Sequence, residues 1–490
     1  MARKNSSSAK KELVELITNY EAAKADDRQL YLDGDQLADI ADWYATERKF
    51  DEAQEVINYG LHLHPRSTDL LIEQAYLYLD TQKLQKAKTV AAAITEEYEP
   101  DVKMLKAELL LNEGNLEEAQ GLLNSIEDAD DLATITDIVY LFLDLGYPEN
   151  AKAWLERGKS RYADKQDYLA LTADYLFATH QTEAAIEAYN KLIDKAPYNA
   201  SYWMGLAKCH FIEENVDKTV EACDFALAAD ENCGEAYAYK AHSFFYLNNS
   251  DEAIENYLKA IKYKSIPPEL GYMFMGLSYA NKEEWQKADD CYTKVIDCFE
   301  KEGDRDSILL IDTYTSKAFA LSNLQRYEEA HQLCDKAKKL NPDEGLIYLT
   351  DGKVYLAEEM EDLASEAFQK AIELNPGVEM CYLVASTYSE NDYLYDAKEY
   401  YEMAYKLDPK YELVTEKLSV LCLMSNEIED FFKYNSECKS PLGLDVIEDL
   451  LASPNHRAED EKALKEVLKR MKRENKKKGK YTFRVINIIL

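Results

Sequence analysis

The chain has 490 residues, a formal net charge of −36 and a hydrophobic fraction of 47%. So acidic a body repels nucleic acid phosphates and favours solubility and basic partners. No stretch approaches the ~20 apolar residues that span a bilayer, and no signal peptide pattern opens the chain. A cytoplasmic protein with no membrane span is therefore predicted.

The first elements expected are a disordered segment and a helix. Residues 1–10 are polar and basic, which predicts a disordered N-terminus. Apolar residues from Leu13 to Tyr20 then recur at helical spacing. Residues 11–33 are therefore predicted to form an N-terminal capping helix.

Residues 34–410 carry a repeated pattern, which is marked by a recurring alanine. The markers are Ala53, Ala87, Ala119, Ala151, Ala185, Ala253, Ala288, Ala330, Ala364 and Ala397, with Thr219 in the place of an eleventh. The steps between them are 34, 32, 32, 34, 34, 34, 35, 42, 34 and 33 residues. A period in this range is typical of stacked supersecondary units.

Other positions recur around each marker. A small residue stands twelve positions before it, a bulky one nine before, and an aliphatic, aromatic or thiol side chain four after. The exceptions to these three rules are Val139, His210 and Ala91 respectively. Apolar residues at helical offsets on both sides of a short polar break predict two amphipathic helices joined by a tight turn. Proline twelve positions after the marker ends five of the units, because it lacks an amide donor.

Two interruptions predict bends in the array. Ile266, Pro267 and Pro268 break the pattern once. The step of 42 residues contains the polar segment 298–306, which indicates longer helices or a wider loop.

Beyond residue 410 the pattern decays. Residues 411–440 are interpreted as a degenerate twelfth repeat, and residues 441–475 as C-terminal capping helices. Residues 476–490 form a basic and then apolar tail. Two interpretations of the tail stay open, a disordered end and a segment that docks onto the acidic array of the same chain or of a second copy.

The repeated unit resembles the tetratricopeptide repeat. The clearest runs are YEEAHQLCDKAKKLNP from Tyr327 to Pro342 and ASEAFQKAIELNP from Ala364 to Pro376. The resemblance implies an all-α fold, a right-handed α-solenoid superhelix of about 11–12 helical hairpins with helical caps.

The resemblance also implies a binding surface, because first helices of such repeats line a concave groove that holds a peptide or a partner's helix. The groove residues expected in repeats six to eleven are Met204, Lys208, Phe211, His242, Phe245, Met273, Leu277, Thr315, Phe319, Leu349, Lys353, Leu356, Tyr382 and Ser386. Some family members clamp carboxylates of chaperone tails with a Lys/Asn/Arg set. Here Lys208 is followed one repeat later by His242 and not by an asparagine or arginine, so binding of chaperone tails is not expected.

No catalytic constellation stands out in the sequence. The seven histidines and nine cysteines show no zinc-ligand spacing. Phosphate-binding loops and serine elbows are missing as well. Neighbouring acids such as Asp130 and Asp131 are typical of a solvated helix face. We therefore predict no enzymatic activity, no metal and no cofactor.

The sequence thus favours a non-enzymatic scaffold or assembly adaptor with a protein partner of unknown identity. The alternative is a regulatory protein whose basic C-terminal tail contacts nucleic acid, ribosomes or anionic lipid. Nucleic acid is an unlikely ligand of the acidic array itself. Self-association through the degenerate twelfth repeat is a third option.

Overall fold

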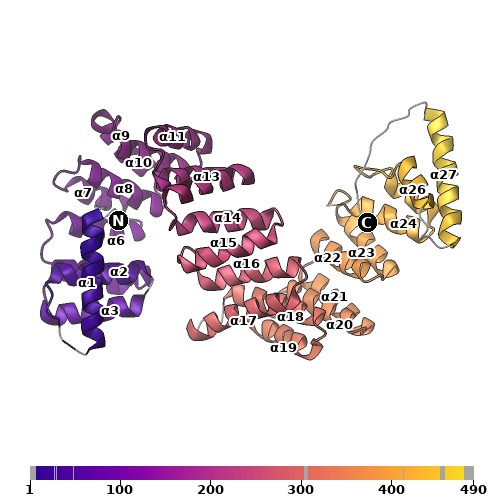
Figure 1. Cartoon of the computed structure of the whole chain (residues 1–490), viewed down its shortest axis with the longest axis horizontal. Coiled ribbons are helices and arrows are strands. Elements are labelled where there is room, and N and C mark those ends of the chain that lie inside the picture. Colours follow the sequence, from indigo (N-terminus) through magenta and orange to yellow (C-terminus); the bar gives the residue numbers. More distant parts are fainter. Residues whose placement is uncertain are drawn as a thin grey trace. The chain divides into compact units, whose positions relative to one another are not determined.

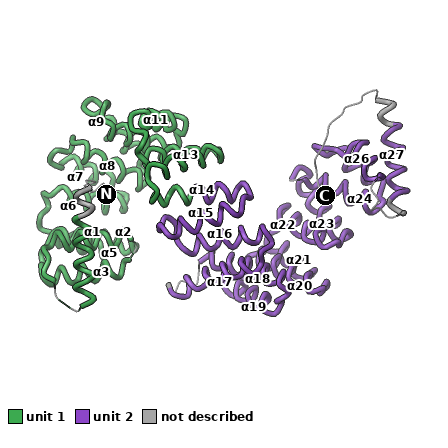
Figure 2. The backbone as a smooth tube through the Cα atoms, in the orientation of Figure 1, with its two compact units in different colours: residues 1–239 green, residues 240–490 purple. Residues whose placement is uncertain are grey.

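The computed structural model describes residues 7–26, 28, 30–47, 49–302, 307–411, 413–452 and 458–478. These residues form 27 α-helices and no strand, and successive helices pack as hairpins (Figure 1). The prediction of an all-α repeat solenoid is thereby confirmed. The chain divides into two compact units, Met1–Tyr239 and Lys240–Leu490 (Figure 2).

Twelve helical pairs account for most of the chain. Their first helices are α2 (Gly34–Thr46), α4 (Thr68–Asp80), α6 (Pro100–Asn112), α8 (Leu132–Asp144), α10 (Gln166–Ala178), α12 (Ala200–Ile212), α14 (Gly234–Tyr246), α16 (Pro268–Asn281), α18 (Ile308–Asn323), α20 (Gly345–Ala357), α22 (Val378–Glu390) and α24 (Val414–Met424). Their second helices are α3 (Phe50–Leu63), α5 (Leu84–Ala91), α7 (Leu116–Asn124), α9 (Pro148–Tyr162), α11 (Thr182–Lys195), α13 (Val216–Ala229), α15 (Ser250–Lys262), α17 (Trp285–Glu302), α19 (Tyr327–Leu340), α21 (Glu361–Leu374), α23 (Leu394–Leu407) and α25 (Ile428–Asn435).

Three further helices flank the pairs. Helix α1 (Ser7–Ala25) begins inside the segment 1–10, for which the sequence predicts disorder, and residues 1–6 lie outside the described residues. Helices α26 (Leu444–Ala452) and α27 (Ala458–Lys478) follow the last pair and pack on each other. Helix α27 buries Val467 and Leu464, and it also contacts α24. Residues 479–490 of the predicted tail lie outside the described residues.

The marker residues lie at the contact between the two helices of each pair. All ten marker alanines and Thr219 have no exposed surface. Small residues twelve positions earlier are buried too, for example Ala241 and Ala385. Where this residue is glycine, the aromatic ring four positions after the marker covers it, as Tyr292 covers Gly276. Small side chains on facing positions let the helices approach closely, and the large residue fills the remaining space.

The turn inside each pair has one recurring backbone geometry. The residue five positions before the marker has a φ between 55° and 79° in pairs two to twelve, in which Gly114 and Gly146 are the only glycines. The next amide donates to the carbonyl of the bulky residue nine positions before the marker, at 2.7–2.9 Å. This six-to-one bond and the left-handed residue form a Schellman C-cap. It ends each first helix at the same place relative to the marker.

A glycine is expected to be more favourable than a larger residue at this left-handed position. Glu359→Gly should raise the midpoint of thermal unfolding and increase the free energy of unfolding by roughly 0.5–1 kcal/mol. The reason is that the cost of a left-handed backbone at a residue with a side chain exceeds the cost of ordering the more flexible glycine. The reverse change, Gly146→Gln, should lower stability by a similar amount. Shifts of the same sign in both variants would contradict this account.

Helix lengths explain the irregular steps between markers. The two steps of 32 residues each contain a short second helix, α5 with 8 residues and α7 with 9. The step of 42 contains longer helices, α17 with 18 residues and α18 with 16, while residues 303–306 lie outside the described residues. The twelfth pair keeps the register, since fully buried Phe431 stands 34 residues after Ala397.

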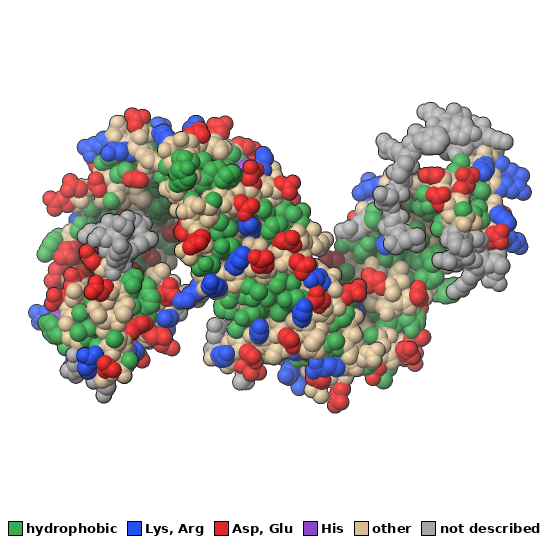
Figure 3. All heavy atoms as spheres, in the orientation of Figure 1, with side chains coloured by type: hydrophobic (Ala, Val, Ile, Leu, Met, Phe, Trp, Pro, Cys, Tyr) green, Lys and Arg blue, Asp and Glu red, His purple; other side chains and the backbone are tan. Residues whose placement is uncertain are grey.

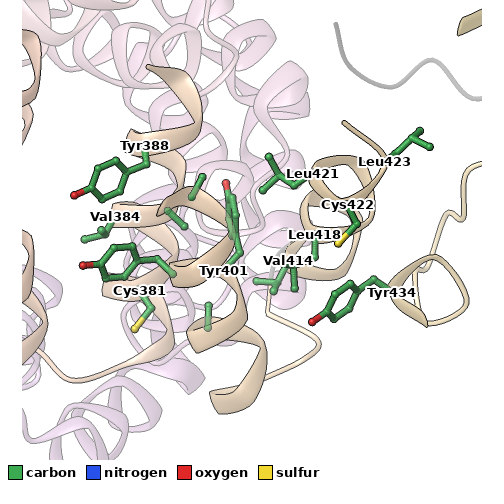
Figure 4. Close-up of a cluster of buried hydrophobic side chains, with 14 of the residues drawn as sticks. Cys381, Val384, Tyr388, Tyr401, Val414, Leu418, Leu421, Cys422, Leu423 and Tyr434 are labelled. Atoms are coloured by element: carbon green, nitrogen blue, oxygen red, sulfur yellow. The ribbon is translucent and has the colours of Figure 1, made fainter. Parts of the chain in front are cut away.

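The largest buried cluster of unit 2 joins α20 to α27. Tyr401 of α23 lies between Cys381 and Val384 of α22 and Val414 of α24 (Figure 4). Because the cluster is continuous across neighbouring pairs, each pair is stabilised by the next.

Candidate protein-binding surface

The residue eleven positions before the marker occupies an accessible face of every first helix. We call these twelve residues the inner ladder: Asp42, Tyr76, Glu108, Tyr140, Asp174 and Lys208 in unit 1, and His242, Leu277, Phe319, Lys353, Ser386 and Val420 in unit 2. None of them is buried. The residue just before each one faces the second helix of its pair, and a step of one residue turns the side chain by ~100° away from that contact.

Members of the inner ladder contact each other across neighbouring first helices. The hydroxyl of Tyr140 on α8 donates to a carboxylate oxygen of Asp174 on α10. The Nζ atom of Lys353 on α20 lies 5.4 Å from the ring centre of Phe319 on α18. Contacts of this kind join neighbouring members of the inner ladder on α8 and α10 and on α18 and α20.

A tyrosine of the buried core also reaches this surface in three pairs. The hydroxyl of Tyr189 donates to Asp174 at 2.5 Å, and that of Tyr257 lies 2.8 Å from Nδ1 of His242. In the eleventh pair Tyr401 and Ser386 share a hydrogen bond of 2.9 Å. Each tyrosine stands four positions after its marker. The polar ladder residue therefore satisfies the one polar group of a buried ring.

In unit 1 the first helices are strongly acidic. Helices α2, α4, α6, α8 and α10 carry twelve Asp and Glu residues and two lysines. Both lysines are engaged outside the ladder, since Lys106 pairs with Glu97 at 2.8 Å and Lys103 donates to the carbonyl of Ser125 at 2.5 Å. Carboxylates and tyrosines therefore dominate this half of the inner ladder.

Glu108 lies among other carboxylates of this surface. Burial first, and then the nearby carboxylates of Asp80 and Asp144, together raise the pKa of Glu108 to about 7. Burial and the carboxylate of Asp42 likewise raise the pKa of Asp80. Among the described residues no cation forms an ion pair with Asp80 or Glu108, so no ion pair offsets the burial that raises their pKa values.

Stability is expected to fall as the pH rises through this titration. The folded chain holds a proton on Glu108 up to about pH 7, whereas the unfolded chain loses it near its ordinary pKa of ~4.3. The folded state thus binds more protons between these values, and the stability that this proton provides is lost as the pH rises. Glu108→Gln should therefore stabilise the protein by on the order of 1–2 kcal/mol at pH 8 and have little effect at pH 4.

Chemical unfolding of both proteins at the two pH values measures this effect. Glu117→Gln on the exposed face of α7 is the matched control. An equal gain at both pH values would contradict the assignment of the titration to Glu108.

In unit 2 the ladder has no carboxylate, and aromatic rings gather around it. The ring of His242 meets Phe274 edge-on at 5.0 Å, and Phe245 meets the same ring at 5.3 Å. Tyr257 stacks on the other side of Phe274 at 5.4 Å. Burial lowers the pKa of His242, which therefore stays neutral near pH 7. His242, Phe245 and Phe274 form one aromatic patch on α14 and α16, with the buried ring of Tyr257 from α15 beneath it.

A second patch lies on α18 and α20. The ring of Phe319 is 38% exposed and meets Trp285 edge-on at 5.6 Å. Burial lowers the pKa of Lys353, which stands over this ring. No carboxylate of the described residues forms an ion pair with Lys353. The patch thus combines an exposed ring with a half-buried cation that lacks a counter-ion.

The structure narrows the set of groove residues predicted from the sequence. Four of the fourteen are buried, with exposed fractions of 3% for Met204, 7% for Met273, 4% for Leu349 and 3% for Leu356. These four pack against neighbouring helices and offer no contact surface, because first helices touch more than one neighbour. The other ten retain accessible area: Lys208, Phe211, His242, Phe245, Leu277, Thr315, Phe319, Lys353, Tyr382 and Ser386.

Some of these ten residues already contact other side chains of the same unit. Lys208 pairs with Glu235 at 2.7 Å, and Phe211 meets Tyr239 edge-on at 5.1 Å. Tyr382 contacts both Tyr401 and Tyr411. The sequence prediction missed the acidic ladder of unit 1, although the marker register that locates it was available.

Features of metal-binding and membrane-spanning proteins are both absent from the described residues. The described side chains contain no group of three or more His, Cys, Asp and Glu residues arranged to hold a metal ion. Across the described ranges, every helix is too short or too polar to cross a bilayer.

Comparison with known families identifies the repeat. Models described as tetratricopeptide repeat match residues 170–232, 234–266, 311–344, 347–377 and 378–411. The chain is therefore a tetratricopeptide repeat protein, as the resemblance predicted.

Curated relatives match parts of the chain. Anaphase-promoting complex subunit 7 of Dictyostelium discoideum is 24% identical over 246 residues, which is 49% of this chain and 40% of that protein. A TPR repeat-containing protein of Methanocaldococcus jannaschii is 27% identical over 197 residues, 39% of this chain and 34% of that protein. Human protein O-mannosyl-transferase TMTC3 is 24% identical over 214 residues, 42% and 23% of the two chains. The chain thus spans less than half of the length of these relatives.

Solved structures show similar helical repeats. YrrB, described as a TPR protein with an unusual peptide-binding site, has a TM-score of 0.34 and 18% identity, over 40% of this chain and 96% of its own. The APC/C hetero-tetramer Cut9–Hcn1 gives a TM-score of 0.34 and 14% identity, over 79% and 90% of the two chains.

Proposed function

We propose that this protein is a non-enzymatic scaffold that holds a peptide or helix of a partner protein on the inner ladder of unit 2. The observation that carries the proposal is the patch of Phe319 and Lys353. An exposed ring stands beside a cation that has no counter-ion among the described residues, on successive first helices. Such a combination of an aromatic anchor and a cation is typical of an interaction surface.

The tetratricopeptide repeat supports this proposal at the level of the family, since it is a protein-interaction module. Apolar and aromatic ladder residues suit a peptide or amphipathic helix of the partner. The alternative function depends on the basic C-terminal tail, residues 476–490, of which residues 479–490 lie outside the described residues.

Quantitative affinity capture with the full chain tests the proposal. Phe319→Ser should weaken retention of the specific partner by at least about tenfold, because an aromatic anchor at an interface is typically worth 2 kcal/mol or more. Lys353→Glu should weaken it as well, while circular dichroism of both variants stays helical.

Tyr395→Ser is the matched control, since Tyr395 is an 81% exposed aromatic residue on the second helix α23. It should retain the partner at the level of the unaltered chain. An identical set of captured proteins from all three variants would refute binding on the inner ladder of unit 2.

A further inference from the structure

The chain carries a second distinctive surface, on helix α27. Its apolar side, with Val467 and Leu464, packs against the rest of unit 2. At 100° per residue, Lys462, Lys469 and Arg473 fall on the opposite side of the helix. All three are exposed, and none forms an ion pair among the described residues. Basic side chains gather along this helix (Figure 3).

The neighbouring cations of α27 are bound differently. Lys472 pairs with Glu448 at 2.6 Å and Arg470 pairs with Glu429 at 2.5 Å. These pairs fix the helix to unit 2. Glu466 is the one described acid on the free side. The free side is therefore basic, and it is carried by a helix that its own unit holds in place.

The acidic half of the inner ladder is the complementary surface of the same chain. Asp80, Glu108 and Asp144 stand on three successive first helices, α4, α6 and α8, with no cation of the described residues paired to them. Asp80 and Asp144 stand next to the ladder, four residues or about one helical turn after the ladder tyrosines Tyr76 and Tyr140, which supply flat contact area. On this face burial and neighbouring carboxylates raise the pKa of Asp80 and of Glu108, which is not expected for carboxylates on a fully solvated helix.

The two surfaces also agree in length. Lys462 and Arg473 are eleven residues apart on a helix, which corresponds to about 16 Å. Helices α4 and α8 are separated by two helix-to-helix spacings, which amount to about 16–20 Å. The cations of α27 can therefore face the carboxylates of all three first helices at once.

We propose that α27 of one copy binds the acidic inner ladder of unit 1 in a second copy, so that the protein assembles head to tail. The occupant is inferred from charge complementarity between two surfaces of one chain. Such a contact joins different patches on the two copies, and it leaves one free patch at each end. The assembly goes beyond the proposed scaffold function, which uses the ladder of unit 2.

Sedimentation of the full chain at low and high salt tests the assembly. At low salt the average mass should rise with protein concentration, and 0.5 M salt should return it to the monomer, because salt screens exposed charges. A chain that stays monomeric at every concentration in low salt overturns the proposal. A contact of the two surfaces within one copy would also leave the chain monomeric, and it would overturn the proposal in the same way.

Charge exchange then assigns the contact to its residues. One variant combines Lys469→Glu with Arg473→Glu, and the other combines Asp80→Lys with Asp144→Lys. Each alone should self-associate at least about tenfold more weakly. An equimolar mixture should assemble again, because each copy then offers a surface opposite in charge to that of the other. Failure of the mixture to assemble overturns the assignment.

Controls carry the same charge changes elsewhere. Lys339→Glu with Lys410→Glu matches the first variant, and Glu117→Lys with Glu183→Lys matches the second, all at exposed positions. These control pairs should leave the affinity of self-association within twofold of that of the unaltered chain. Phe319→Ser should leave it unchanged as well, so failure of the scaffold proposal and failure of this one are distinguishable.

Discussion

Replacing Phe368 by alanine should destabilise unit 2 by about 3–5 kcal/mol, the largest loss expected for a single substitution here. The ring has no exposed surface and meets Tyr388 edge-on at 5.0 Å. It also covers Gly352, which has no side chain to move into the vacated space. A cavity that cannot collapse costs more than the lost transfer energy alone.

Denaturant unfolding and amide hydrogen exchange measure this loss. Because each pair contacts mainly its neighbours, exchange should rise first in α20, α21 and α22. Tyr395→Ala, at an exposed position of α23, should change stability by less than about 0.5 kcal/mol. A near-neutral Phe368→Ala would mean that the ring does not fill the space above Gly352.

The repeat register was predictable from the sequence because several constraints act on the same residues. The marker and the small residue twelve positions earlier must both be small where two helices touch, so a spacing in the sequence reports a contact in space. The turn adds a third constraint, since the Schellman cap fixes where each first helix ends. Even the twelfth pair, with Phe431 in the marker position, keeps this register.

The accessible surface was harder to predict for a physical reason. A first helix packs on its own second helix, on the preceding pair and on the following pair, so an apolar residue on it has several possible neighbours. Met273 and Phe319 are both large and apolar, yet one is 7% exposed and the other 38%. Periodicity gives the face of the helix but not which neighbour covers it.

The acidic ladder was missed for another reason. In so acidic a chain, carboxylates on helices were attributed to solvation, and the binding residues were selected from repeats six to eleven, with no carboxylate among them. The distinguishing signal is position: Glu108 and Asp174 stand at the same offset from their markers as Phe319 and Lys353. Applying the register to all twelve pairs would have located them.

Gly276→Ala should destabilise unit 2 by about 2–3 kcal/mol, although alanine is the better helix former by up to ~1 kcal/mol. A Cβ atom at this position would lie 2.5 Å from Cε1 of Tyr292, far inside van der Waals contact. Tyr292 is 1% exposed, so its ring cannot move away without displacing its neighbours. Gly121→Ala on α7 is the control, because nothing lies within 4 Å of its added Cβ. This control should stabilise by roughly 0.5–1 kcal/mol.

The chain itself contains the compensating change for Gly276→Ala. In the ninth pair the same two positions hold Ala318 and Cys334, both fully buried. Adding Tyr292→Cys to Gly276→Ala reproduces that combination in the eighth pair. The double variant should therefore be more stable than the sum of the two single losses, with a coupling of about 1–2 kcal/mol in denaturant unfolding. Strictly additive losses would show that glycine is required at position 276 by the backbone rather than by the ring of Tyr292.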